Sequence, residues 1–247
     1  MGNKFVLVGG GSTQSPSILE VLRRRYQDLD MTELVLYDND PIRVNMLGKY
    51  TKMYYEESGS PVRVSYTTDI DAALTGADFL FMQIRPGLNK QRAIDEKICM
   101  RHGIVGQETC GLGGFSFAMR VIPAIMSILE KVRQLCPDAW ILNYTNPEAV
   151  LSEAISQQFP DLKALCICDM PISIEEAIAG YFHKPLRDLT FKYFGMNHFG
   201  WWTNIIDEHG VDLLPQLRQD VQSGRTTTLL QTNEETIGDQ YWSDTYK

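Results

Sequence analysis

The glycine-rich segment after the first apolar run is the feature that most restricts the fold. Residues 5–8 read Phe-Val-Leu-Val, residues 9–13 read Gly-Gly-Gly-Ser-Thr, and the apolar residues of 18–26 have helical spacing. A buried strand, a glycine turn and a helix in this order are typical of the opening of a dinucleotide-binding sheet. The third glycine of the usual fingerprint is missing, because Gln14 stands there.

Strand-like and helical segments alternate along most of the chain. The spacing predicts further strands at 34–37, 62–66, 79–83, 140–142 and 164–167, and helices at 41–57, 115–135 and 147–159. Parallel strands need crossover connections, which a helix between successive strands supplies. The sequence therefore predicts an α/β fold over residues 1–170, with a Rossmann doubly wound parallel sheet.

The pattern changes after residue 170. Residues 189–194 and 201–206 read as two strands joined by the glycine-containing segment 195–200. They predict the start of a second, mixed α+β domain over residues 171–247, which is expected to be truncated.

The composition argues against several functions. The chain has 23 Lys and Arg against 31 Asp and Glu, a formal net charge of −8, and 44% hydrophobic residues. Such an acidic globular chain is a poor ligand for nucleic acid or an anionic membrane. No apolar run reaches the roughly 18 residues of a membrane span. The N-terminus lacks a signal-peptide layout, and five cysteines without disulfide-framework spacing predict a reducing cytoplasm.

The glycine turn and the end of the second strand together predict an NAD site. Gly9 and Gly11 allow the backbone to approach a pyrophosphate closely, and Ser12 and Thr13 follow them toward a helix N-terminus. Asp38 ends the second strand, where a carboxylate can accept a hydrogen bond from a ribose hydroxyl and would repel a 2′-phosphate. NAD is therefore favoured over NADP. The alternative is a glycine turn beside an exposed acidic turn.

Four polar clusters follow predicted strands, where ligands of doubly wound sheets bind. They lie at 83–87, 106–114, 143–147 and 166–171. Each cluster also has a structural interpretation that involves no ligand. In the same order, these are a surface arginine, a structural loop, an Asn-Pro turn and an inert core cysteine. The last cluster, with Asn197 and His198 further on, offers thiolate and imidazole donors that suit a borderline divalent metal. Residue chemistry alone leaves the metal site and the structural reading both open.

These segments together resemble the NAD- and metal-dependent glycosidases of glycoside hydrolase family 4. The match runs along nearly the whole chain at 9–13, 36–40, 84–85, 105–111, 143–147, 168–171 and 197–203. The last of these reads Asn-His-Phe-Gly-Trp-Trp-Thr. The resemblance implies a Rossmann domain followed by a lactate-dehydrogenase-like second domain, in agreement with the pattern above. Glycosidases of this family do not use the usual pair of carboxylates.

The resemblance also implies a mechanism and a set of site residues. NAD⁺ takes hydride from C3 of the sugar, a divalent metal such as Mn²⁺ stabilises the enediolate, and elimination is followed by addition of water and return of the hydride. Cys168 and His198 match the metal ligands of the family. Asp169 matches the acid for the leaving oxygen, and Arg85 and Asn146 match positions that contact substrate.

The residue after the cysteine predicts the substrate class. Members that act on 6-phospho-α-glucosides carry Cys-Asp-Met-Pro, as at 168–171 here, whereas 6-phospho-β-glucosidases tend to have Asn after the Cys. The resemblance thus implies a 6-phospho-α-glucosidase that cleaves phosphorylated disaccharides such as maltose 6′-phosphate. Because phosphotransferase uptake makes such sugars, a cytoplasmic enzyme is expected. The β-glucosidases, and the α-galactosidases and α-glucuronidases of the family, are the alternatives.

Family members are nearly twice as long as this chain. Their C2 base, a tyrosine, and an arginine for phosphate recognition lie in the half that this sequence does not include, and neither Tyr241 nor Tyr246 is assigned the base role. We therefore expect an N-terminal part of an enzyme that is a homo-oligomer, a dimer or a tetramer, at full length. Two other hypotheses stand beside it: a lactate- or malate-type dehydrogenase, and a truncated NAD-binding module without turnover.

Overall fold

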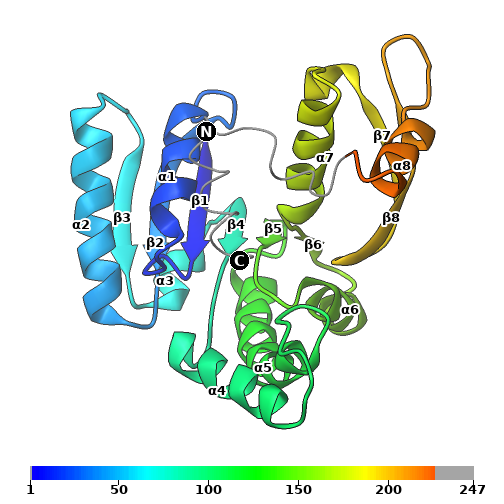
Figure 1. Cartoon of the computed structure of the whole chain (residues 1–247). Helices are drawn as coiled ribbons and strands as arrows, with labels where there is room; N and C mark the ends of the chain where they lie inside the picture. The colour runs from blue at the N-terminus through cyan, green and yellow to red at the C-terminus, as the bar shows by residue number, and fades with distance from the viewer. Residues whose placement is uncertain (1, 226–247) are drawn as a thin grey trace. The chain divides into compact units, whose positions relative to one another are not determined.

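The computed structural model describes residues 2–225 of the chain, so Tyr241 and Tyr246 lie outside the described residues. The chain divides into two compact units, Met1–Ile167 and Cys168–Lys247 (Figure 1). In the first unit the strands are β1 (Asn3–Val8), β2 (Met31–Tyr37), β3 (Arg63–Thr67), β4 (Phe79–Met82), β5 (Trp140–Asn143) and β6 (Lys163–Cys166). Its helices are α1 (Ser15–Arg24), α2 (Pro41–Glu57), α3 (Ile70–Leu74), α4 (Leu88–Arg101), α5 (Leu112–Leu135) and α6 (Glu148–Gln158).

The six strands form one sheet in the order β3-β2-β1-β4-β5-β6, and every pair in it is parallel. The order reverses beside β1, so the sheet has the topological switch point of a doubly wound fold between β1 and β4. The predicted α/β class and Rossmann sheet are confirmed. All predicted strands and helices of this unit form, with ends that shift by no more than a few residues.

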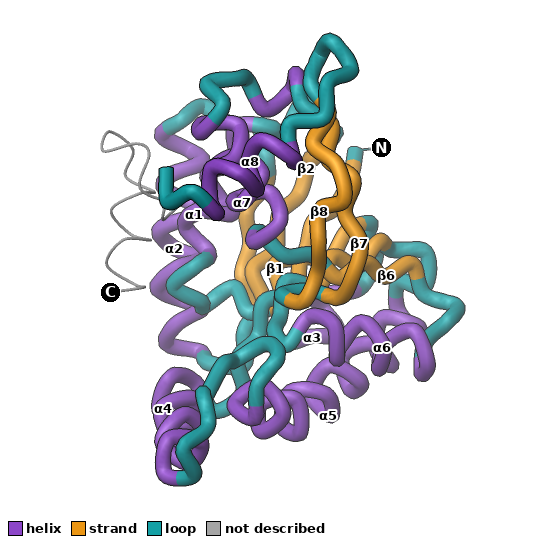
Figure 2. Tube along the Cα trace, turned by 45° about the vertical axis from the view of Figure 1, so that its right-hand side comes forward, coloured by secondary structure: helices purple, strands orange, loops and turns teal. Residues whose placement is uncertain are grey.

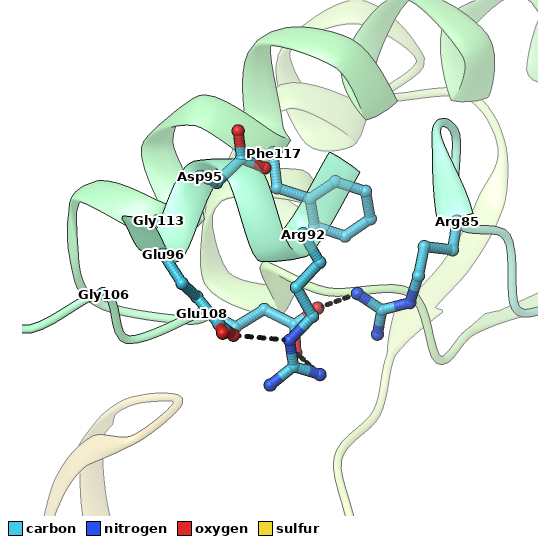
Figure 3. A pocket seen from close by; sticks show the side chains of 8 residues that line it. All are labelled: Arg85, Arg92, Asp95, Glu96, Gly106, Glu108, Gly113 and Phe117. Atoms are coloured by element: carbon cyan, nitrogen blue, oxygen red, sulfur yellow. Dashed lines mark hydrogen bonds and ion pairs between the residues drawn. The ribbon is translucent and has the colours of Figure 1, made fainter. Parts of the chain in front are cut away.

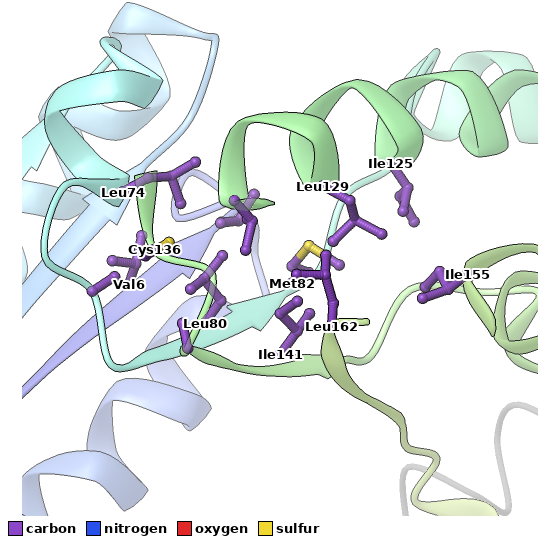
Figure 4. Close-up of a cluster of buried hydrophobic side chains, with 14 of the residues drawn as sticks. Val6, Leu74, Leu80, Met82, Ile125, Leu129, Cys136, Ile141, Ile155 and Leu162 are labelled. Atoms are coloured by element: carbon purple, nitrogen blue, oxygen red, sulfur yellow. The ribbon is translucent and has the colours of Figure 1, made fainter. Parts of the chain in front are cut away.

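Both faces of the sheet are buried, as the alternating residues of β1 show. Phe5 and Leu7 belong to a cluster with residues of α1 and α2, whereas Val6 and Val8 belong to another with residues of α3, α5 and α6. Successive side chains of a strand point to opposite faces, so an uninterrupted apolar run is needed where helices cover both. Figure 4 shows the second cluster, to which β4 contributes Leu80 and Met82 and α5 contributes Ile125 and Leu129.

Helix α5 supplies the centre of that cluster. Val121, Ile125, Leu129 and Val132 have no exposed surface and follow one another at spacings of three or four residues. Among the described residues α5 is also the one helix that is long and apolar enough to cross a membrane by length and composition. The buried stripe packs against the sheet, so the apolar composition of α5 is that of a core helix in an α/β unit.

Sequence periodicity does not predict α4, which occupies Leu88–Arg101 between β4 and α5. Only Asp95 and Cys99 of its 14 residues are buried, so it has no apolar stripe from which periodicity could be recognised. Arg120 of α5 forms an ion pair with Asp95 and so ties the two helices together. The short helix α3 and, in the second unit, α7 and α8 were not predicted either.

The second unit contains α7 (Met170–Tyr181), η1 (Leu186–Asp188), β7 (Thr190–Met196), β8 (Phe199–Ile206) and α8 (Leu214–Gln222). The two strands pair antiparallel as a hairpin (Figure 2), and its small core includes Ile178, Ile205 and Leu217. The predicted start of a mixed α+β region is therefore confirmed. The assignment of residues 1–170 and 171–247 to an NAD-binding and a substrate domain stays a prediction.

Candidate functional site

The loop between β1 and α1 is fitted closely to the neighbouring strands. Gly9 has a φ of +85°, and a Cβ atom at this position would lie 2.1 Å from the carbonyl oxygen of Gln83, at the end of β4. The N–H groups of Gly9 and Gly10 both donate to the carbonyl oxygen of Tyr37, at 2.9 and 2.8 Å. Only glycine fits at residue 9, because both the backbone angle and the contact exclude a side chain.

Asp38 supports this loop from the end of β2. Its Oδ2 accepts a hydrogen bond from the N–H of Gly11 at 2.9 Å, and its Oδ1 accepts one from the N–H of Asp40 at 3.0 Å. Sequence reasoning expected Asp38 to bind a ribose hydroxyl and did not foresee these two backbone donors. A carboxylate oxygen accepts about two hydrogen bonds, so the half-buried group retains acceptor capacity for a ribose.

The residues between the glycines and α1 leave donors for an anion. The N–H of Ser12 donates to Gly9, and the N–H of Gln14 donates to the Ser12 hydroxyl. Thr13 is exposed, and its N–H makes no hydrogen bond to the described part of the chain. Among residues 2–225, no side chain caps the N-terminus of α1. Orphan donors at a helix N-terminus attract phosphate, so the loop is chemically suited to a pyrophosphate.

Arg85 lies just beyond β4, next to a small pocket. It forms an ion pair with Glu108, and the Arg92 guanidinium reaches the other carboxylate oxygen of Glu108 at 3.2 Å. Figure 3 shows both guanidinium groups directed at that carboxylate, beside the ring of Phe117. The Arg85 guanidinium carbon lies 5.3 Å from the ring centre, which adds a cation–π contact. Arg85 is thus held in place by Glu108, a partner that sequence reasoning did not assign.

The glycine-rich cluster at 106–114 does not follow a strand, contrary to the prediction. It connects α4 to α5, and Gly113 and Gly114 already belong to α5. The Gln107 side chain accepts hydrogen bonds from the N–H groups of Thr109 and Cys110, so much of its polarity is used inside the loop. The expectation failed because the helix before the loop, α4, was not recognised.

The segment after β5 contains one structural amide and one that is available. Asn143 is fully buried and exchanges hydrogen bonds with the backbone of Thr145. Thr145 in turn accepts from the N–H of Ile84 at 3.0 Å, which joins the ends of β4 and β5. Asn146 precedes a cis proline peptide and is half-buried, and its side chain makes no hydrogen bond within the described residues. Of the two amides, Asn146 is the one free to contact a ligand.

The second unit brings Cys168, Asp169 and His198 together. The Sγ atom of Cys168 lies 3.6 Å from Nε2 of His198 and 3.8 Å from Oδ1 of Asp169. Both residues 168 and 169 stand immediately before α7, and His198 occupies the turn between β7 and β8 with a φ of +58°. A left-handed conformation is uncommon for residues other than glycine, although histidine adopts it more often than most, and such residues cluster at functional sites.

The thiol and the imidazole fit the requirements of a shared metal ion. Two donors at about 2.0–2.3 Å from one ion lie about 3.1–3.6 Å apart, which agrees with the Sγ–Nε2 distance of 3.6 Å. The described residues contain no group of three or more His, Cys, Asp and Glu that could hold a metal. The pair therefore supplies two donors, and other coordination positions would fall to substrate oxygens or water.

Family models match nearly the entire chain. Residues 4–183 match the family 4 glycosyl hydrolases, and residues 193–247 match the C-terminal domain of the same family. The chain is 41% identical over 244 residues to a phospho-alpha-glucosidase, PagL, of Clostridium acetobutylicum, covering 98% of this chain and 54% of that protein. It is 38% identical over 243 residues to a maltose-6′-phosphate glucosidase of Bacillus subtilis, covering 98% and 54%.

Comparison with solved structures gives the same result as comparison with sequences. A crystal structure of a 6-phospho-alpha-glucosidase from gut microorganisms, in complex with NAD and Mn²⁺, superposes with a TM-score of 0.86 at 38% identity, covering 90% of this chain and 51% of that one. A lactate dehydrogenase from Eimeria maxima has a TM-score of 0.63 at 16% identity, covering 90% and 61%, and shares the fold alone. The chain spans about half the length of the curated relatives it matches. It belongs to family 4 of the glycosyl hydrolases.

Proposed function

We propose that this chain carries the NAD-binding and metal-binding part of a 6-phospho-α-glucosidase that hydrolyses sugars such as maltose 6′-phosphate. The observation that carries the proposal is the contact of Cys168 with His198 at 3.6 Å, with the Asp169 carboxyl beside it. Two relatives at about 40% identity are named for phospho-α-glucosidase activities, which supports the α-linked phosphosugar as substrate. Cytoplasmic location and homo-oligomeric assembly belong to the same proposal.

In the second unit, Cys168 and His198 would hold a divalent metal, with Mn²⁺ as the expected ion. When bound, the metal would act as a Lewis acid on substrate oxygens, and NAD⁺ would accept and return a hydride. Asp169 would protonate the leaving oxygen. It immediately precedes α7, and its side chain does not cap that helix, so the carboxyl is not committed to a structural hydrogen bond there.

In the first unit, the loop of Gly9, Gly11, Ser12 and Thr13 would bind the pyrophosphate of NAD. Asp38 would use its remaining acceptor capacity for the adenine ribose while holding Gly11. A 2′-phosphate would meet this carboxylate directly, which supports NAD rather than NADP.

Arg85 and Asn146 would contact the substrate. The Arg85 side chain is about one-third exposed, and Glu108 fixes one edge of its guanidinium, leaving other N–H donors for sugar hydroxyl or phosphate oxygens. Asn146 would contribute an amide from the end of β5.

The test is cleavage of p-nitrophenyl α-glucoside 6-phosphate and of its β anomer, with NAD⁺, Mn²⁺ and a thiol reductant, each omitted in turn. We expect any nitrophenol that is released to come only from the α anomer, to require both NAD⁺ and Mn²⁺, and to form without net NADH. Release of nitrophenol when NAD⁺ or Mn²⁺ is omitted would refute the oxidation and elimination mechanism. Stoichiometric NADH without a metal requirement would instead indicate a dehydrogenase. NAD binding without any release would favour a module that holds the cofactor and does not turn over alone.

A further inference from the structure

Gln83 joins the end of β4 to the dinucleotide loop through its backbone. Its N–H donates to the carbonyl oxygen of Val8 at 2.9 Å. Its own carbonyl oxygen faces Gly9 so closely that no Cβ atom could stand between them. The residue is 8% exposed, so it sits beneath the loop rather than on the surface.

The side chain of Gln83 reaches the start of helix α1. Its Nε2 donates to the hydroxyl of Ser15 at 3.0 Å, although the two residues are 68 positions apart. Ser15 is the first residue of α1 and has no exposed surface, and its N–H donates to Ser12 within the loop. One carboxamide therefore links β4, the loop and the helix N-terminus.

The other end of the carboxamide has no partner among the described residues. The Oε1 atom of Gln83 is buried and makes no hydrogen bond to the described residues. A buried acceptor without a partner destabilises a fold, and an apolar side chain of similar size would avoid that loss. Among strand residues such as Met82 and Val8, which have no exposed surface, apolar packing is the local norm. Stability alone therefore does not account for a glutamine here.

We infer that Gln83 is a positioning residue of the NAD site, an inference that rests on the proposed function. Its carboxamide holds the Ser15 hydroxyl, and through Ser15 it fixes the first turn of α1 and residues 9–14 in the geometry that binds a pyrophosphate. No side chain in the described part of the chain caps this helix N-terminus, so its orphan N–H groups depend on such support to face one anion. Gln83 itself need not contact the cofactor.

The test compares Gln83→Leu and Ser15→Ala with the wild-type chain in calorimetric titrations with NAD and with ADP-ribose. Each variant is expected to bind both ligands about tenfold more weakly, the size typical of one lost hydrogen bond. Affinity for adenosine, which has no phosphate, should stay within about twofold of wild type when followed by ligand-observed NMR. Because the two residues act through one contact, the double variant should lose little more than either single variant.

Thr51→Val is the matched control. Thr51 is fully buried and donates to the carbonyl oxygen of Leu47 inside α2, so its loss removes a buried hydrogen bond elsewhere in the same unit. This variant should lower the melting temperature and leave NAD affinity unchanged. If Gln83→Leu does not fold, the NAD affinity of Ser15→Ala alone tests the inference.

Unchanged NAD affinity in folded Gln83→Leu or Ser15→Ala would overturn the inference while leaving the proposed function intact. An equal loss for adenosine would also overturn it, since that result describes general damage to the unit. Failure of the wild-type chain to bind NAD would overturn the proposed function, and this inference with it.

Discussion

Replacing Gly9 by alanine should destabilise the first unit more than any other glycine substitution at a comparable backbone angle. The new Cβ would lie 2.1 Å from the carbonyl oxygen of Gln83 and 2.9 Å from its carbonyl carbon. That carbonyl cannot retreat easily, because the N–H of Gln83 is bonded to Val8 across the β1–β4 ladder. A left-handed angle costs a residue with a Cβ about 1–2 kcal/mol, and forcing atoms into a packed region costs about 1–3 kcal/mol more.

Gly76→Ala separates these two contributions. Gly76 has a φ of +70° in the same unit, and a Cβ there would meet nothing within 4 Å. It should therefore show the backbone penalty alone. At about 2–4 °C per kcal/mol for a chain of this size, we expect Gly9→Ala to melt roughly 4–20 °C below wild type and Gly76→Ala roughly 2–8 °C below. Thermal unfolding followed by far-ultraviolet circular dichroism measures both. Equal shifts in the two variants would refute the argument from the Gln83 contact.

Three further predictions follow from particular side chains. Cys168→Ser should weaken Mn²⁺ binding in calorimetric titration by at least about tenfold, and Cys110→Ser, in an exposed loop, should not change it. Ile125→Ala, at a position with no exposed surface, should lower the free energy of unfolding by about 2–5 kcal/mol, whereas Ile42→Ala, at 78% exposure, should change it by less than about 0.5 kcal/mol. Burial raises the pKa of the Cys136 thiol to about 11 from 9.0. Because the folded pKa is raised, the thiol stabilises the fold below the unfolded pKa, and this stabilisation is lost between about pH 9 and 11. The free energy of unfolding measured by urea titration should therefore fall by up to about 3 kcal/mol over that range. A Cys136→Ala variant whose free energy of unfolding falls equally with pH would contradict this.

The sequence by itself was enough for the fold class and for the family. Both signals are local: an apolar run such as 5–8 must be buried on both faces, and the glycines after it permit a turn that other residues cannot form. The motif around Cys168 and the one around His198 are also short and readable in order along the chain. Helix α4 escaped because it buries only Asp95 and Cys99, and a helix without an apolar stripe has no periodic signature.

Only the tertiary structure shows which residues form hydrogen bonds and ion pairs with one another. The sequence predicts Asp38 as a ligand for ribose, and only the folded chain shows that its carboxylate also accepts a hydrogen bond from the N–H of Gly11. The sequence predicts Arg85 as a site residue but not its ion-pair partner Glu108, because the two lie 23 positions apart with an unpredicted helix between them. The Gln83–Ser15 hydrogen bond spans 68 residues and depends on β4 lying next to β1. Local sequence fixes φ, turn type and apolar pattern, whereas strand order and side-chain pairing result from packing the whole sheet, and no single segment encodes them.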